Sequence, residues 1–152
     1  MWGLPPDDHR YYPLLAEFGD LGIPFRTQVG HSGQLQGSEA SRPFPYLGRM
    51  ALEFSEIKII GRHIGVPWLD EMISLMIKYP NVLVDTSAHK IKRYPAGLIN
   101  YMNSINRHKV LFGLNHPFWP PSECLKGIGD LSLFSEVRDL FLFKNAQLIF
   151  NL

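Results

Sequence analysis

The sequence contains a single cysteine, Cys124, so the chain cannot form an internal disulfide. Its stability must come from side-chain packing, and a reducing compartment is the default expectation for such a chain. We therefore expect a cytoplasmic protein. Because Cys124 has no basic residue directly beside it in the sequence, we expect an inert thiol instead of a nucleophile.

Long apolar runs and an excess of one charge are also missing. No stretch approaches the roughly 20 apolar residues that a membrane helix needs, and residues 1–10 lack the apolar run of a signal peptide. Fifteen Lys and Arg stand against fourteen Asp and Glu. This balance gives no electrostatic reason to expect nucleic acid or an anionic membrane as a partner.

The composition that remains is typical of a globular domain. The chain has 152 residues, of which 45% are hydrophobic and 19% are charged. Its length fits one domain over residues 1–152. Twelve prolines and thirteen glycines fall mostly between apolar runs, which predicts many short elements joined by tight loops.

Short apolar runs alternate with segments of helical spacing along the whole chain. The runs are β-branched or aromatic and more continuously apolar than alternating, as in strands covered on both faces. They start roughly 25 to 33 residues apart, which is the length of a βαβ unit. The pattern predicts an α/β fold with a parallel sheet and right-handed crossovers. The predicted strands are 24–29, 57–60, 82–84 and 109–112. The predicted helices are 10–21, 44–54, 68–79, 95–105, 133–143 and 146–150.

Polar residues follow each predicted strand: His31, His63, Asp85 with Ser87, and Asn115. The carboxyl ends of parallel strands share one rim, so these residues are expected to converge although they are far apart in sequence. Convergent imidazoles and carboxylate or carboxamide groups are what a metal site requires. The loop 31–42 is the longest irregular segment, and long loops after strands are often functional.

Other interpretations compete at each position. A single histidine at a strand end is more often structural than a ligand, but His31 and His63 are both followed by x-Gly, which favours a shared site. Asp85 and Ser87 could cap the segment that follows them. Arg62 is expected to point away from His63, toward the covering helices and an ion pair there.

Several further residues carry expectations of their own. Trp68 and Trp119 stand beside prolines near the rim, where they either line a substrate pocket or simply pack. His116 precedes a proline and fits either a rim or a surface position. Four methionines at helical spacing are predicted to lie in the core: Met50, Met72, Met76 and Met102. Three histidines in polar surroundings are expected at the surface: His9, His89 and His108.

Three runs carry a resemblance to a known family: residues 28–33 (QVGHSG), 58–68 (KIIGRHIGVPW) and 111–117 (LFGLNHP). Together with 81–87 and 145–150, they resemble the amidohydrolase-related family. This branch of the amidohydrolase superfamily contains aminocarboxymuconate-semialdehyde decarboxylase and related aromatic-acid decarboxylases and lactonases. The resemblance extends from about Asp7 onward. Its motifs are specific for the family but not for one reaction.

The resemblance implies strands five to eight of a distorted (β/α)8 TIM barrel, and one divalent metal, usually zinc. His31 matches the family's metal-binding histidine after the fifth strand. His63 matches the histidine after the sixth strand, which orients metal-bound water or substrate. Asn115 occupies the place of the aspartate after the eighth strand, a metal ligand and proton shuttle. The implied catalytic residues are His63 and Asn115, the metal ligands His31 and Asn115, and the substrate-pocket residues Trp68, Ser87 and Trp119.

Two departures from the family bear on activity. The His-x-His pair of the family's first strand occurs nowhere in the sequence. Asn115 carries no negative charge and cannot accept a proton from bound water. The first hypothesis is therefore a fragment of a metal-dependent hydrolase or decarboxylase that acts on a small carboxylated substrate and is inactive alone.

Two alternatives come from other classes of protein. One is a non-catalytic, degenerate half-barrel with unpaired edges, apolar helix faces and an uncovered barrel interior, which associates with itself or with a chain supplying the first half. The other is an open α/β ligand-binding sheet. The lack of a Gly-rich phosphate loop counts against nucleotide binding in that case.

Overall fold

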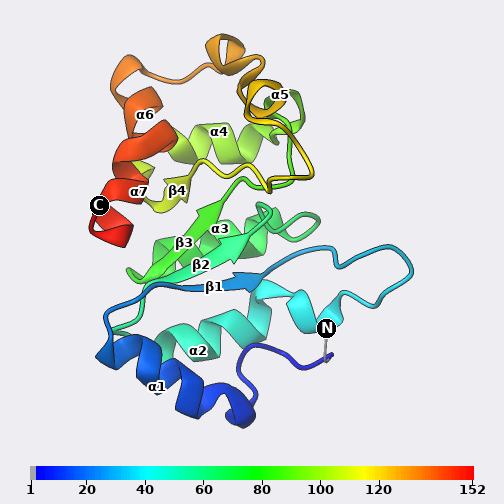
Figure 1. The fold of residues 1–152 in the computed structure, drawn as a ribbon, viewed down its shortest axis with the longest axis vertical. Coiled ribbons are helices and arrows are strands. Elements are labelled where there is room, and N and C mark those ends of the chain that lie inside the picture. The colour runs from blue at the N-terminus through cyan, green and yellow to red at the C-terminus, as the bar shows by residue number, and fades with distance from the viewer. Residues whose placement is uncertain (1–2) are drawn as a thin grey trace.

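The computed structural model describes residues 3–152 as a four-stranded parallel sheet with helices around it (Figure 1). The strands pair in chain order, with Phe25 opposite Ile59 and Ile59 opposite Val82. Figure 1 shows α1 and α2 beyond one edge of the sheet, α4, α6 and α7 beyond the other, and α3 behind the middle strands. The strands are β1 (Phe25–Gln28), β2 (Ile59–Arg62), β3 (Val82–Asp85) and β4 (Val110–Leu111).

Each connection between strands carries at least one helix, as parallel pairing requires. A π-helical turn, Leu140–Lys144, joins α6 and α7 into one continuous helical segment from residue 135 to 150. Among the described residues, no helix is long and apolar enough to cross a bilayer. The α-helices are α1 (Tyr12–Asp20), α2 (Gly48–Glu53), α3 (Leu69–Lys78), α4 (Ala96–Met102), α5 (Pro121–Leu125), α6 (Ser135–Asp139) and α7 (Asn145–Phe150).

All four predicted strands are present, and the prediction of a parallel sheet in chain order is confirmed. The largest error is in β2, which begins at Ile59 and continues through Arg62 instead of ending at Ile60. Ile57 belongs to the preceding turn, where its N–H bonds to the carbonyl of Phe54. The short helix α5 was not predicted, because the prolines that precede and begin it are also loop signals.

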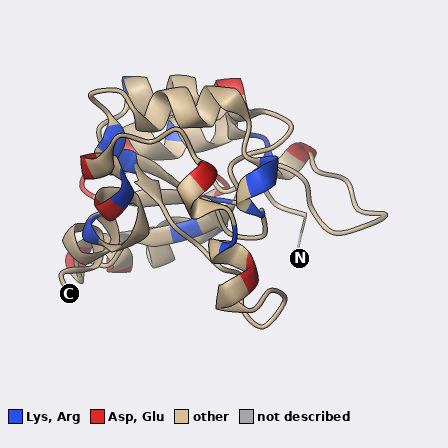
Figure 2. Ribbon diagram, turned by 90° about the horizontal axis from the view of Figure 1, so that it is seen from above, with Lys and Arg blue, Asp and Glu red and all other residues tan. Residues whose placement is uncertain are grey.

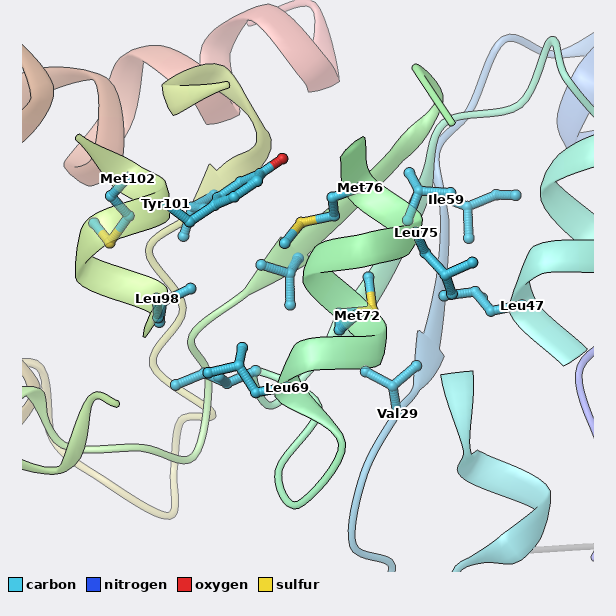
Figure 3. Packing of buried hydrophobic residues seen from close by; sticks show 14 of the residues in the cluster. Val29, Leu47, Ile59, Leu69, Met72, Leu75, Met76, Leu98, Tyr101 and Met102 are labelled. Carbon is cyan, nitrogen blue, oxygen red and sulfur yellow. The ribbon is translucent and has the colours of Figure 1, made fainter. Parts of the chain in front are cut away.

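The main core lies between the sheet and its outer helices. Figure 3 shows Met72, Leu75 and Met76 of α3 packed between Leu47 and Ile59 on one side and α4 on the other. Each such fully buried side chain contributes about 1.5–3 kcal/mol through loss of apolar surface from water. The four methionines predicted for the core are buried: Met50, Met72, Met76 and Met102.

The opposite face of the sheet, which corresponds to a barrel interior, carries a smaller apolar cluster. Ile60, Leu83 and Leu111 face this side, since side chains alternate along a strand. They were expected to be uncovered, but this expectation is wrong: their exposed fractions are 0%, 2% and 4%. Ala146 and Ile149 of α7 pack against them, so the carboxy-terminal helix covers part of the inner face.

Basic and acidic residues are interspersed along the elements (Figure 2). Several form ion pairs across the surface, including Arg42 with Glu71 and Arg107 with Glu136. The arrangement agrees with the formal net charge of +1.

Candidate active site

The residues predicted at the strand ends gather at one end of the sheet. In Figure 1 the strand arrows and the long loop after β1 point to the same side. His31, His63 and Asn115 line a common cavity of about 360 Å³ there. Asp85 and Ser87 line a second cavity of about 390 Å³ that also includes Asn115. The parallel topology thus brings together groups from four separate segments.

His63 is held by the segment after β3. Its Nδ1 lies 2.9 Å from the Ser87 carbonyl and 3.1 Å from Ser87 Oγ. A carbonyl only accepts hydrogen bonds, so Nδ1 carries the proton in the neutral ring and Nε2 keeps a free lone pair. The His63 backbone has φ +68°, in the left-handed region that costs a non-glycine residue energy and recurs at functional sites.

Asp85 is the buried carboxylate that organises this corner. It is 2% exposed. Its Oδ1 accepts hydrogen bonds from the Ser87 hydroxyl, from the Ser87 N–H at 3.0 Å and from the His63 N–H at 3.4 Å. Its Oδ2 pairs with the guanidinium of Arg26. Through these contacts Asp85 positions Ser87 and, through it, the His63 ring.

Arg62 lies on the inner face of the sheet, so the prediction that it points toward the helices is wrong. Strand β2 continues through Arg62, and alternation puts its side chain on the same face as that of Ile60. Its Nη2 donates a hydrogen bond to Asn115 Oδ1 at 3.1 Å. The predicted strand ended at Ile60, two residues before Arg62, so the strand alternation was not applied to the Arg62 side chain.

Arg26 and Arg62 are the site residues that the sequence analysis missed. Both line the 390 Å³ cavity, together with Asp85 and Asn115. Arg26 stands opposite Ile60 in the sheet register, so it also faces the inner side. The signal available in the sequence was the charge itself, because an arginine within a predicted strand needs a partner when it is removed from water. The remaining walls are largely apolar and include Leu111, Phe112, Ala146 and Phe150.

The other predicted site residues lie around these cavities. The His31 side chain is exposed, and its ring centroid is 6.3 Å from that of Trp68. The Trp68 ring in turn lies 5.9 Å from the Arg42 guanidinium. Trp119 lies under the ammonium group of Lys90, 4.0 Å from its ring centroid. As lined by residues 3–152, the two cavities include neither tryptophan.

His89 was expected at the surface, and this expectation is wrong. It lines the 360 Å³ cavity beside His63. Burial, together with the nearby His63, lowers the pKa of His89 below its usual range. The loop after Ser87 turns back at Ala88, where φ is +66°, and this turn brings His89 inward. His9 and His108 are exposed, as expected.

Cys124 is buried, and burial raises the pKa of its thiol above the usual range. A thiol in this setting stays protonated at neutral pH and is a poor nucleophile. The burial of Cys124 agrees with the expectation of an inert cysteine.

Two glycines allow the strand-end segments to approach closely. A Cβ at Gly30 would lie 2.4 Å from the Val66 carbonyl oxygen, and its φ is +87°. A Cβ at Gly113 would lie 2.9 Å from the Cβ of Ser87. Larger residues at either position would displace a segment that carries a site residue, so the glycines are needed for the geometry of the rim.

The donor set does not form a self-contained divalent-metal centre. Among residues 3–152, no group of three or more His, Cys, Asp and Glu side chains is placed to hold a metal ion. His31 and Asn115 line one cavity, but Asn115 Oδ1 accepts from Arg62, and Asp85 is engaged by Arg26. A protein zinc site needs about four donors, so these residues would have to be supplemented.

A sequence profile of the family described as amidohydrolase matches residues 1–152. No functionally curated protein matches the sequence. Solved structures do: an uncharacterised TIM-barrel protein from Bordetella bronchiseptica superposes with a TM-score of 0.82 at 26% identity. That alignment covers 96% of this chain and 52% of the other.

Two similar structures are those of decarboxylases. The 5-carboxyvanillate decarboxylase from Sphingomonas paucimobilis gives a TM-score of 0.69 at 16% identity, over 100% of this chain and 56% of the other. A dihydroxybenzoic acid decarboxylase from Polaromonas sp. JS666, with bound manganese and the inhibitor 2-nitroresorcinol, gives 0.66 at 18% identity, over 97% and 55%. At these identities the likeness establishes the fold alone. The chain spans about half the length of these proteins, and its sheet is part of a TIM-type barrel.

Proposed function

The chain belongs to the amidohydrolase family, and from this premise we propose that residues 1–152 are a single domain forming the carboxy-terminal half of a decarboxylase or hydrolase active site. The half-site binds a small carboxylated substrate and does not turn it over alone. The observation that carries the proposal is the pair of adjoining cavities at the strand ends, one lined by His63 and the other by Arg26 and Arg62. Both cavities include Asn115.

The arginines support recognition of a carboxylate. A guanidinium is always charged and matches the planar geometry of a carboxylate, which it can bind through two parallel hydrogen bonds. Arg26 and Arg62 outnumber the one carboxylate of that cavity, Asp85. Leu111 and Ala146 in the walls suit an aromatic ring. The two decarboxylases of similar fold are named for aromatic carboxylates, which agrees with this substrate class.

His63 is the residue proposed to exchange a proton with the substrate. With Nδ1 donating to the Ser87 carbonyl, the Nε2 lone pair is left to accept a proton. Asp85 and Ser87 act as positioning residues that fix the ring. Asn115 cannot share this task, because an amide does not take up a proton at neutral pH. Asn115 instead orients Arg62, whose Nη2 donates a hydrogen bond to Asn115 Oδ1.

Inactivity of the isolated chain follows from what the half-site lacks. The family resemblance implies a divalent metal, for which the sequence analysis expects zinc. The structure of the Polaromonas decarboxylase contains manganese. Of the proposed ligands, His31 is the single strong donor, and Asn115 is already engaged. Further ligands would have to come from a chain that supplies the first half of the barrel. Trp68 and Trp119 remain proposed contacts for the outer part of a substrate.

Calorimetric titration with 2,6-dihydroxybenzoate and with resorcinol tests the proposal, because the two compounds differ only in the carboxylate. The acid should bind at least about tenfold more tightly, as expected for a charge-assisted arginine contact. Carbon dioxide release should stay at the uncatalysed rate with excess manganese or zinc. Equal affinities would refute the carboxylate site, and robust turnover would refute the inactivity of the chain alone.

A second candidate function is non-catalytic association. The described sheet has four strands, so β1 and β4 are its edges, whereas a closed barrel pairs every strand. A degenerate half-barrel that pairs with itself or with another chain would use these edges. Association without measurable binding of 2,6-dihydroxybenzoate would favour this candidate.

A further inference from the structure

We propose that Arg62 supplies the positive charge that a metal ion supplies in the metal-dependent relatives, so that Arg62 and Asn115 form an anion site from which divalent cations are excluded. The inference rests on the proposed function only for the chemical class of its ligand, a small aromatic carboxylate. It extends that function by assigning the charge at the strand-eight position to the protein itself.

The orientation of Asn115 is the first step. Arginine has only hydrogen-bond donors, so the Asn115 atom 3.1 Å from Arg62 Nη2 must be the amide oxygen. The other amide atom is then the nitrogen, which is a donor and cannot bind a cation. Asn115 thus offers a metal only the oxygen that it already presents to a guanidinium.

Charge repulsion is the second step. A divalent cation on Asn115 Oδ1 would share this oxygen with Arg62 and would lie within a few ångströms of its charge. Like charges at that separation repel strongly in a partly buried site. The nearest carboxylate in the same cavity, Asp85, is already paired with Arg26 and cannot offset the repulsion. The positive charge of this site therefore favours the binding of an anion.

The free donor of Arg62 is the third step. Its Nε is buried and has no hydrogen-bond partner among the described residues. A buried donor without a partner is costly and uncommon, and it indicates a missing acceptor. The cavity beside Arg62 holds about 390 Å³, lies within the size range of small-ligand sites, and has apolar walls. A carboxylate in this cavity would pair with the Arg62 guanidinium and place its ring against Leu111.

Benzoate and Mn²⁺ are the probes for the test. Benzoate affinity of the full chain is measured by calorimetry with EDTA and with excess Mn²⁺, and Mn²⁺ binding by the electron paramagnetic resonance signal of the free ion. We expect benzoate to bind equally well under both conditions. Arg62→Met should weaken the affinity for benzoate by about tenfold or more. Arg62→Lys should weaken it by less, because lysine keeps the positive charge but cannot donate two parallel hydrogen bonds. Lys92→Met, at an exposed lysine, is the control for the change in charge.

The manganese arm tests the exclusion of cations independently of the ligand. The wild-type chain should bind Mn²⁺ weakly, and Asn115→Asp should tighten binding only modestly, because Arg62 remains. The double variant Arg62→Met with Asn115→Asp should bind Mn²⁺ at least about tenfold more tightly than wild type, since it gains a negative charge and loses a positive one. Thermal melting checks that each variant folds. If Arg62→Met does not fold, the benzoate and Mn²⁺ affinities of the wild type and of Arg62→Lys test the inference instead.

The outcomes separate the inference from the proposed function. Benzoate binding that needs Mn²⁺, or that Arg62→Met leaves unchanged, would overturn the inference and leave the proposed carboxylate function standing. Mn²⁺ binding to the wild type as tight as to the double variant would also overturn it. No benzoate binding to the wild type would overturn both the anion site and the proposed function.

Discussion

At the scale of single residues, the geometry at the strand ends depends on a few side chains whose orientation is fixed by hydrogen bonds and close contacts. His63 is bonded to Ser87, and Ser87 to Asp85, so the ring orientation is set by a buried carboxylate. Gly30 lets the chain after β1 pass over the Val66 carbonyl, which then accepts the His31 N–H at 2.9 Å. Small changes at these positions should therefore have measurable effects on stability.

The first prediction concerns Gly30→Ala. The new methyl group would meet the Val66 oxygen, and alanine disfavours a φ of +87°. The free energy of unfolding should fall by about 1–3 kcal/mol, measured by urea denaturation. Gly129→Ala is the matched control, because a Cβ there has no atom within 4 Å. An equal effect of both substitutions would contradict the role assigned to Gly30.

The second prediction concerns pH and His89. Its pKa is lowered in the folded chain, chiefly by burial, so the unfolded chain takes up a proton at higher pH than the folded one does. The stability that His89 contributes is therefore present above its unfolded pKa of about 6.5 and is lost as pH falls below it. Urea denaturation from about pH 7.5 to 5.5 should show a smaller loss for His89→Gln than for wild type. His108→Gln, at an exposed histidine, should not reduce the loss; a slope unchanged by His89→Gln would refute the prediction.

At the scale of elements, the ends of helices and strands are held by side chains from distant segments. Lys109, just before β4, donates from Nζ to the carbonyl oxygens of Met76 and Tyr79 at 2.5 and 2.7 Å. These carbonyls end α3, where the last turn lacks intrahelical donors and the helix dipole favours a positive charge. The Tyr79 carbonyl also accepts the Val82 N–H at 3.2 Å. Asn145 acts similarly, since its amide donates to the carbonyls of Arg107 and Val110.

The third prediction therefore concerns Lys109→Met. Methionine keeps most of the apolar stem but leaves both carbonyls without their charged donor. The free energy of unfolding should fall by about 1–3 kcal/mol, measured by thermal and urea denaturation. Lys92→Met, at an exposed lysine of the segment Ile91–Arg93, should change it by less than about 0.5 kcal/mol. A Lys109→Met chain as stable as wild type would show that water replaces the ammonium group without cost.

At the scale of the whole molecule, the chain is half of a closed architecture. Its inner apolar cluster is covered by α7, so the reason first given for association, an uncovered interior, does not hold. The unpaired edges at β1 and β4 remain. Large apolar side chains are also exposed toward the carboxy terminus, with Leu148 at 67% and Leu152 at 86%.

The fourth prediction is that the purified chain associates in solution. Unpaired strand edges offer hydrogen-bonding groups to another copy or to a first-half chain, and exposed leucines add apolar area. Static light scattering over a dilution series should give a mass above the 17.4 kDa of the chain, decreasing on dilution. A sharp species of 17.4 kDa at every concentration would contradict the prediction.

The sequence by itself determined the order of the strands and the residues that meet at their ends. Both follow from local patterns: buried parallel strands are continuously apolar, a crossover needs a minimum length, and parallel strands end on the same side. His31, His63 and Asn115 were therefore predictable neighbours, and the family resemblance rested on the same residues. These features need no knowledge of how distant side chains pack.

Only the tertiary structure decided which groups face the cavities and what they bind. Two extra residues at the end of β2 place Arg62 on the inner face, and a strand boundary depends on pairing with β1 and β3, which no local pattern encodes. The contacts of Arg26 with Asp85 and of Arg62 with Asn115 join residues 59 and 53 positions apart. The cover that α7 provides likewise depends on where the chain turns after β4, because burial is a property of the assembled fold.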